Sequence, residues 1–379
     1  MSVLPSKFFF NLGQVKRPLK GVSGLGDIAV NIVGRGNAKE LASFNLNPNF
    51  HNRIPPKTAY DIVLKLHDRN SYLGGVVTTA LATAAALGVP SHLYATVGDD
   101  QNGQFLIDEV KNRNITPNIT VTKGNTALNP VMVLNDGESA SGSLVGVSYD
   151  IREPGTRKLQ GSKMFLTSSH LIRNPENFNV LREAFFSATK AGAKSILMIK
   201  DPLILKECRE HIKSFYEKDI VDTCIGNKND FAVLFNIDRF PEDTLMDRVV
   251  AHARETGKHF VITNGSRDIA LINNKQVTYI PPERVLHSVN KNGASNVFVG
   301  GYIAGLAYGM QEIDAIRTGS KAAKEIIERL DPTPNEDIMR DIKRSLKTYF
   351  NQKRRLSLGK ANPSTTHSTG TNLANINVN

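Results

Sequence analysis

The chain of 379 residues carries 47 Lys and Arg against 36 Asp and Glu, which gives a formal net charge of +11. Residues 1–20 contribute +4 and residues 340–360 contribute +7, so residues 21–339 are neutral overall. A neutral body argues against a nucleic-acid-binding core. Two cysteines exclude a disulfide framework, and the longest apolar run, Val76 to Val89, is too short to span a bilayer. We expect a cytoplasmic protein, although the acid-poor N-terminus leaves an organelle presequence open.

Strand-length apolar runs alternate with helical patterns along most of the chain. Such alternation predicts an α/β fold with a doubly wound, mostly parallel sheet that helices cover on both faces. The predicted strands are 21–26, 92–97, 195–199, 220–225 and 260–263, and the predicted helices are 103–112, 296–308, 315–329 and one from Val76.

Two stretches interrupt this alternation, at about 36–72 and 119–150. Both are rich in Asn, Gly, Ser and Thr with short alternating runs, which favours a small β lid on the main sheet. The main domain is then 21–333, with a basic extension at 1–20, a basic helix at 334–352 and a disordered tail at 353–379.

The segment that carries chemistry is Asn290-Lys291-Asn292-Gly293-Ala294-Ser295-Asn296, followed at once by an apolar helix. Small residues at a helix start expose backbone amides at the positive end of the helix dipole. The amides of Gly293, Ala294 and Ser295 can therefore hold an anion, with Lys291 nearby.

This segment resembles the Asp-Thr-x-Gly-Ala-Gly-Asp signature of the PfkB, or ribokinase-like, sugar and nucleoside kinases, and most of all their adenosine-kinase branch. The resemblance implies a ribokinase-like fold, ATP and Mg²⁺ as cosubstrates, and a nucleoside or sugar as acceptor. It also implies that the last position, Asn296, is where the family carries the Asp that deprotonates the acceptor hydroxyl.

Other family motifs follow in the expected order. Gly74-Gly75 is similar to the hinge between lid and body, and Val97-Gly98-Asp99-Asp100 is similar to the Gly-x-Asp segment. Asp201-Pro202 resembles the Asp-Pro of the adenosine-kinase branch. Asn227 and Asp230 match the Asn-x-x-Glu motif around magnesium and phosphate, with Asp for Glu, and Thr263 and Gly265 match a turn near the nucleotide.

The departures from the family lie at its substrate and catalytic positions. Asn31 stands where the family has the sugar-binding Asp, Thr79 replaces an Asn after the hinge, and no Arg follows Asp136-Gly137 in the lid. Because the amide of Asn296 cannot accept a proton as a carboxylate does, we expect impaired phosphotransfer and weak nucleotide binding.

Several alternatives stay open or are excluded. Gly24-x-Gly26-x-x-Ala29 fits a dinucleotide fingerprint, but Asp27 would face the pyrophosphate. No P-loop motif occurs in the chain. A working kinase with unusual residues remains an alternative. So does a non-catalytic binding or assembly protein, in which the basic segment 340–360 contacts RNA, an acidic protein or a membrane surface.

Overall fold

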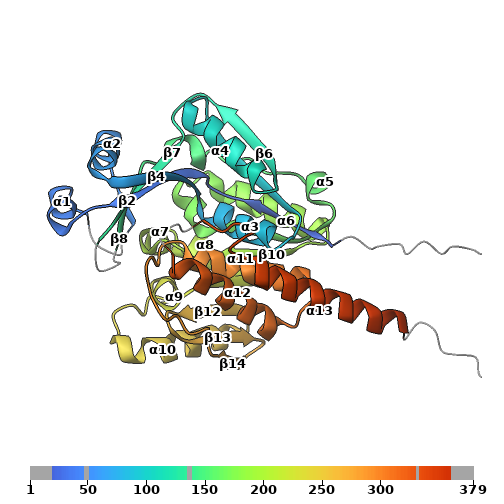
Figure 1. The fold of residues 1–379 in the computed structure, drawn as a ribbon. Helices are drawn as coiled ribbons and strands as arrows, with labels where there is room; N and C mark the ends of the chain where they lie inside the picture. The colour runs from blue at the N-terminus through green and yellow to red at the C-terminus, as the bar shows by residue number, and fades with distance from the viewer. Residues whose placement is uncertain (1–18, 47–50, 135–138, 330–332, 360–379) are drawn as a thin grey trace, which may run out of the picture.

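The computed structural model describes residues 19–46, 51–134, 139–329 and 333–359, and it contains a large and a small sheet (Figure 1). The large sheet is parallel except at one edge, where its last two strands are antiparallel to their neighbours. This confirms the predicted mostly parallel sheet. Its nine strands lie in the order β14 (Gln276–Ile280), β13 (Arg267–Asn273), β12 (Phe260–Asn264), β11 (Thr223–Asn227), β10 (Lys194–Met198), β9 (Ser162–Ser168), β1 (Gly21–Leu25), β5 (Ser91–Gly98) and β6 (Ile115–Thr122).

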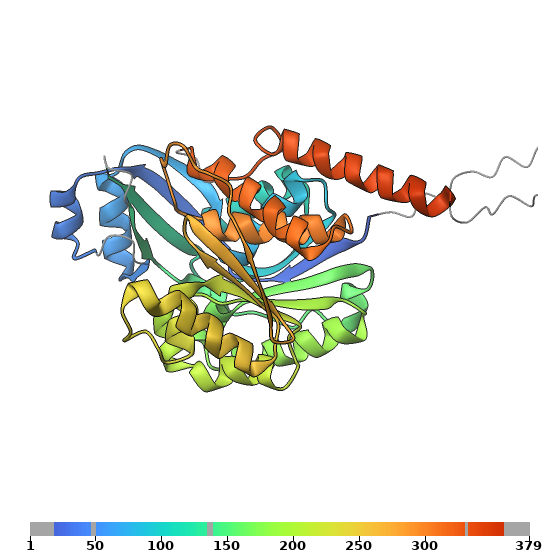
Figure 2. The ribbon, with the colours of Figure 1, turned by 90° about the horizontal axis from the view of Figure 1, so that it is seen from below.

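Helices cover both faces of this sheet, and each face has its own apolar core (Figure 2). One face carries α3 (Val76–Ala86), α4 (Gln101–Asn112), α11 (Ala294–Ala307) and α12 (Glu312–Ile327). The other carries α6 (Asn177–Lys190), α7 (Pro202–Glu207), α8 (Arg209–Glu217), α9 (Lys228–Leu234) and α10 (Glu242–Thr256). The short elements η1 (Gly146–Tyr149), α5 (Thr156–Leu159) and η2 (Ser169–Arg173) lie in the connections on either side of β9.

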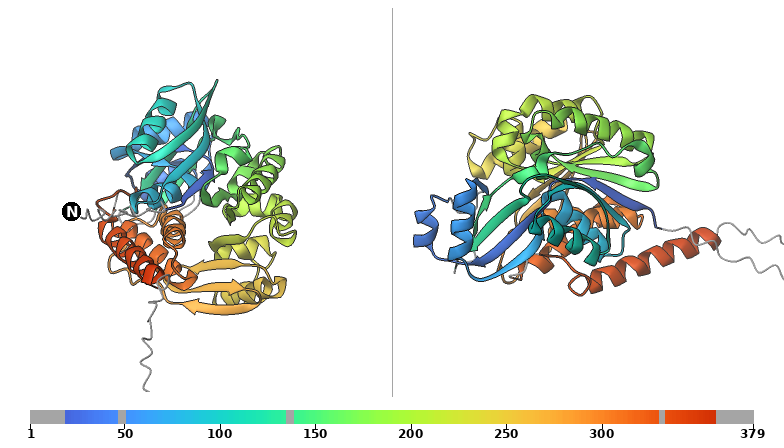
Figure 3. Two further views of the ribbon diagram at one scale, coloured as in Figure 1. Left: turned by 90° about the vertical axis from the view of Figure 1, so that its right-hand side faces the viewer. Right: turned by 90° about the horizontal axis from the view of Figure 1, so that it is seen from above.

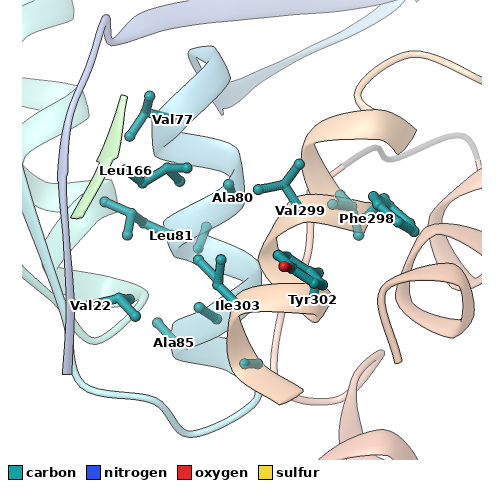
Figure 4. Close-up of a cluster of buried hydrophobic side chains, with 14 of the residues drawn as sticks. Val22, Val77, Ala80, Leu81, Ala85, Leu166, Phe298, Val299, Tyr302 and Ile303 are labelled. Atoms are coloured by element: carbon teal, nitrogen blue, oxygen red, sulfur yellow. The ribbon is translucent and has the colours of Figure 1, made fainter. Parts of the chain in front are cut away.

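Helix α11 is buried around most of its circumference, which fixes the position of its first turn. Val299 and Ile303 pack against α3, where Ala80 faces Val299 (Figure 4). On the opposite side, a Cβ added to Gly301 would lie 2.8 Å from the backbone of α12. Since close-packed interiors resist such changes in volume, the start of α11 is held rigidly at the carboxyl ends of the strands.

The small sheet forms a lid at one end of the molecule, together with α1 (Ala38–Ser43) and α2 (Pro56–Lys65) (Figure 3). Its strand order is β3 (His51–Arg53), β8 (Ser139–Ser143), β7 (Ala127–Val133), β2 (Ala29–Arg35) and β4 (His67–Gly74). The lid therefore begins before residue 36, because β2 pairs with β4 and β7. Residues 119–122, by contrast, lie in β6 of the main sheet, where β6 pairs with β5 along its whole length.

Helix α13 (Arg340–Gly359) projects from the end opposite the lid (Figure 3). It continues past residue 352, where we expected the tail to begin, because Leu346 is buried and Phe350 contacts Tyr308 edge to face at 5.8 Å. The remaining tail, 360–379, residues 1–18 of the basic extension and the Asp136-Gly137 pair lie outside the described residues. In the part of the chain described, no helix is long and apolar enough to cross a membrane.

Candidate active site

A cavity of about 1000 Å³ lies between the carboxyl ends of the main-sheet strands and the lid. Parallel sheets place their binding crevices at this edge, because the loops that leave neighbouring strands converge there. The cavity brings together most of the predicted site residues: Asn31, Gly75, Thr79, Asn227, Asp230, Thr263, Gly265, Gly293, Ser295 and Asn296. Gly74 and Ala294 are not among its lining residues.

The first turn of α11 opens into this cavity. Gly293 caps the helix with a φ of 78°, a conformation that favours glycine. The amide of Ala294, which we expected to be open to an anion, donates instead to Lys291 O at 3.3 Å. Within the described residues, the amides of Gly293 and Ser295 have no protein acceptor. These two N–H groups, at the positive end of the helix, form the anion-binding part of the site.

Asn296 is the third residue of α11 and lies beside these amides. Its Oδ1 atom is buried and has no hydrogen-bond partner in the described structure. An unpaired buried acceptor costs free energy, so a donor supplied by a ligand would be stabilising. The side chain can thus accept a hydrogen bond from a hydroxyl group, but it cannot remove the proton.

Lys200 reaches the same turn from the loop after β10. Its Nζ donates to Ser295 Oγ at 2.5 Å, across a sequence separation of 95 residues. Burial lowers the pKa of Lys200, and attraction to the carboxylate of Asp230 partly offsets this shift. The site therefore contains a buried lysine, whose charged form burial disfavours, next to the free amides of α11.

Asn227 and Asp230 bond to each other at the start of α9. Asn227 Oδ1 accepts from the Asp230 amide at 2.8 Å, and Asn227 Nδ2 donates to Asp230 Oδ2 at 2.7 Å. Burial raises the pKa of Asp230 to about 6, against the opposing attraction of Lys200. Asn227 thus caps α9, and part of the oxygen-donor capacity of both side chains is used within the protein.

The fit of a divalent cation to this cavity is poor. Mg²⁺ prefers charged oxygen ligands in near-octahedral geometry, yet burial raises the pKa of Asp230 to about 6 and so disfavours its charged form, and Asp230 also interacts with Lys200. No group of three or more His, Cys, Asp or Glu side chains suited to a metal occurs among the residues described. We therefore assign no metal ligands in this chain.

A partly buried ion pair fixes the loop that carries Lys200. Arg173 donates to Asp201 Oδ2 at 2.6 Å, and His170 Nε2 lies 3.4 Å from the same oxygen. Burial opposes ionisation of Asp201, but His170 and Arg173 hold its pKa well below the usual range. Asp201 has a φ of 68° and caps α7 through the amide of Leu203. The Asp-Pro motif thus positions the chain rather than presenting a free carboxylate.

The lid side of the cavity holds the predicted substrate positions. Asn31 Oδ1 accepts from Asn129 Nδ2 at 3.2 Å, across paired strands β2 and β7. Thr79 Oγ1 donates to Gly75 O at 2.8 Å, within its own helix. A Cβ added to Gly74 would lie 2.2 Å from Asn31 Oδ1, which explains a glycine at the hinge. Part of the hydrogen-bonding capacity of Asn31 and Thr79 is thus already used.

Thr263 and Gly265 line the opposite side of the cavity. Thr263 is the penultimate residue of β12, with its hydroxyl 3.4 Å from Gly226 O, and Gly265 turns the chain towards β13 with a φ of 61°. These positions are open to the cavity, as the predicted nucleotide turn requires.

Sequence reasoning missed the partners that reach the site from other strands. They are Lys200, Arg173, His170 and Asn129. One signal for Lys200 was present, because it directly follows a predicted parallel strand, where functional side chains gather. No comparable signal marked Asn129, whose role depends on the pairing of two lid strands.

Residues 41–338 match the sequence profile described as pfkB family carbohydrate kinase. None of the curated proteins matched the chain. The fold is similar to a probable sugar kinase from Rhizobium etli CFN 42, with TM-score 0.79 and 18% identity over 86% of this chain and 98% of that one. It is equally similar to adenosine kinase from Sinorhizobium meliloti, with the same TM-score and identity over 86% and 100% of the two chains.

Anopheles gambiae adenosine kinase, solved with P1,P4-di(adenosine-5) tetraphosphate, has TM-score 0.71 and 20% identity over 83% of this chain and 98% of that one. At such identities the structural likeness establishes the ribokinase-like fold, and the sequence profile establishes the family. The chain belongs to the pfkB family of carbohydrate kinases.

Proposed function

We propose that this chain binds the phosphate groups of a nucleotide at the start of α11 and has lost most of the phosphotransfer rate of its family. The observation that carries this proposal is Asn296, an amide at the position of the family base, next to the free amides of Gly293 and Ser295. Loss of a general base typically costs about 10²- to 10⁴-fold in rate.

The residues present can still do part of the family's chemistry. The amides of Gly293 and Ser295 can hold a transferring phosphoryl group, and electrostatic stabilisation of this kind supports catalysis without a base. Asn296 can orient an acceptor hydroxyl group through its free Oδ1. When bound, ATP would supply the phosphoryl group, and a nucleoside or sugar under the lid would accept it.

An active kinase with an unusual base is the second candidate, because another carboxylate lines the cavity. Asp27 is buried with one oxygen 3.3 Å from the Val76 amide and the other 4.0 Å from His170 Nδ1. If the wild-type chain phosphorylates an acceptor at ordinary enzyme rates and Asp27→Asn abolishes this activity, Asp27 is the base.

A binding or assembly role through the basic C-terminal helix has weaker support. Three cations of α13 already pair with acids: Arg340 with Asp337, Lys343 with Glu336, and Arg344 with Asp341. Paired cations contribute less to the attraction of an anionic partner than free ones do. The basic segment remains a proposal that salt-dependent binding of a truncated chain would test.

Two measurements test the main proposal together. Titration calorimetry with ADP should detect binding at millimolar concentration, and a phosphotransfer assay with a panel of nucleosides and sugars should give turnover far below that of active kinases. Absence of ADP binding would contradict the assigned anion site. Ordinary turnover with Asn296 in place would contradict the loss of activity.

A further inference from the structure

Among the described residues, no group of three or more side chains suited to a metal ion occurs, but a lysine side chain lines the cavity. The two residues at the predicted magnesium position, Asn227 and Asp230, are bonded to each other. Lys200, which no family motif predicted, places its ammonium against Ser295 in the first turn of α11. A positive charge is thus held next to the amides that face an incoming anion.

We infer that Lys200 takes the role of the divalent cation, so that phosphate groups bind at the start of α11 without Mg²⁺. This inference rests on the proposed nucleotide site. An ammonium that donates to phosphate oxygens supplies charge-assisted hydrogen bonds, and lysine is a common phosphate ligand in proteins. Ser295 holds the ammonium in place through its hydroxyl group, at 2.5 Å.

The electrostatics of the free site favour an anionic ligand. Lys200 is desolvated, and its pKa is lowered despite the attraction of Asp230. Burial raises the pKa of Asp230 despite Lys200, and the nearby Asp201 is neutralised by Arg173. Burial therefore disfavours the charged form of Lys200 in the absence of a ligand. A phosphate group beside its Nζ would stabilise the ammonium, whereas a divalent cation at the same place would destabilise it further.

The experiment measures ADP binding by calorimetry to the full chain, once with excess EDTA and once with excess MgCl₂. We expect the wild type to bind ADP with similar affinity in both. Lys200→Met should weaken binding in EDTA by about 10- to 100-fold, the range for loss of a charge-assisted hydrogen bond, and Mg²⁺ should restore part of it. Lys206→Met, an exposed lysine on α7 with the same change in charge, should bind as the wild type does.

Each outcome decides the matter. A wild type that needs Mg²⁺ for ADP binding, or a Lys200→Met chain that binds ADP normally in EDTA, overturns the inference. If no chain binds ADP under either condition, the proposed function fails, and titration with inorganic tripolyphosphate in excess EDTA decides the inference separately. Binding to the wild type that Lys200→Met weakens supports the inference, and any other result overturns it. Lys200→Gln removes the amine but keeps a polar side chain, and it should weaken ADP binding in EDTA as Lys200→Met does. Thermal unfolding of each variant shows whether the chain is still folded.

Discussion

Placing a carboxylate at position 296 is the most direct test of the proposed loss of phosphotransfer activity. Asn296 is the third residue of α11, where the helix dipole stabilises a negative charge by about 0.3–1 kcal/mol. Its Oδ1 has no partner to lose, and Lys200 lies one side chain away at Ser295. We therefore expect Asn296→Asp to fold with a stability within about 1 kcal/mol of the wild type.

The gain in activity should nevertheless be small. A general base raises the reaction rate by about 10²- to 10⁴-fold, which corresponds to about 3–5 kcal/mol of transition-state stabilisation. It does so only when the hydroxyl group of the acceptor is correctly placed. Asn31 and Thr79 carry other polar groups than the family residues they replace, and Asn129 and Gly75 already use part of their hydrogen-bonding capacity. We expect Asn296→Asp alone to raise the phosphotransfer rate by less than about tenfold, because positioning of the acceptor and proton transfer act on one transition state.

The triple variant Asn31→Asp, Thr79→Asn and Asn296→Asp should gain more phosphotransfer activity than the sum of the gains from its three single changes. Asp at position 31 keeps the oxygen that accepts from Asn129. The assay is ADP release with a nucleoside and sugar panel, and Asn292→Asp, which adds a charge in the same loop, is the control. A gain of about 100-fold or more from Asn296→Asp alone would refute the claim that the substrate positions have also lost function.

Three further predictions concern stability. Gly301→Ala should cost about 1–3 kcal/mol of unfolding free energy, since its Cβ would lie 2.8 Å from the backbone of α12, as denaturant titration would show. Asp230 binds its proton more tightly in the folded state, because its pKa is raised to about 6. Wild type should therefore lose stability relative to Asp230→Asn as the pH rises from about 4 to 6, and equal melting curves would contradict this. Asp201→Asn leaves Arg173 buried without its carboxylate and should cost about 3–5 kcal/mol, whereas the exposed Asp337→Asn should cost at most about 1.

Local patterns determined much of this protein. The alternation of strands and helices predicted the parallel sheet, because apolar periodicity depends on near neighbours in the sequence. The segment from Gly293 to Asn296 could be identified as a helix start with an amide at the base position, because all its residues are contiguous. The lid boundaries were less accurate, since the assignment of β2 and β6 to their sheets depends on strand pairing.

Tertiary structure alone decided which distant side chains meet in the cavity. Lys200 contacts Ser295 only because the loops after β10 and before α11 converge at the carboxyl edge of the sheet. The ion pair between Asp201 and Arg173 likewise joins the loops that follow two neighbouring strands. Within the lid, the pairing of β2 with β7 places Asn31 next to Asn129. Strand order and register set these contacts, and neither is encoded in any single segment. For this reason the departure of Asn296 from the family signature could be recognised in the sequence, whereas the lysine beside it could not.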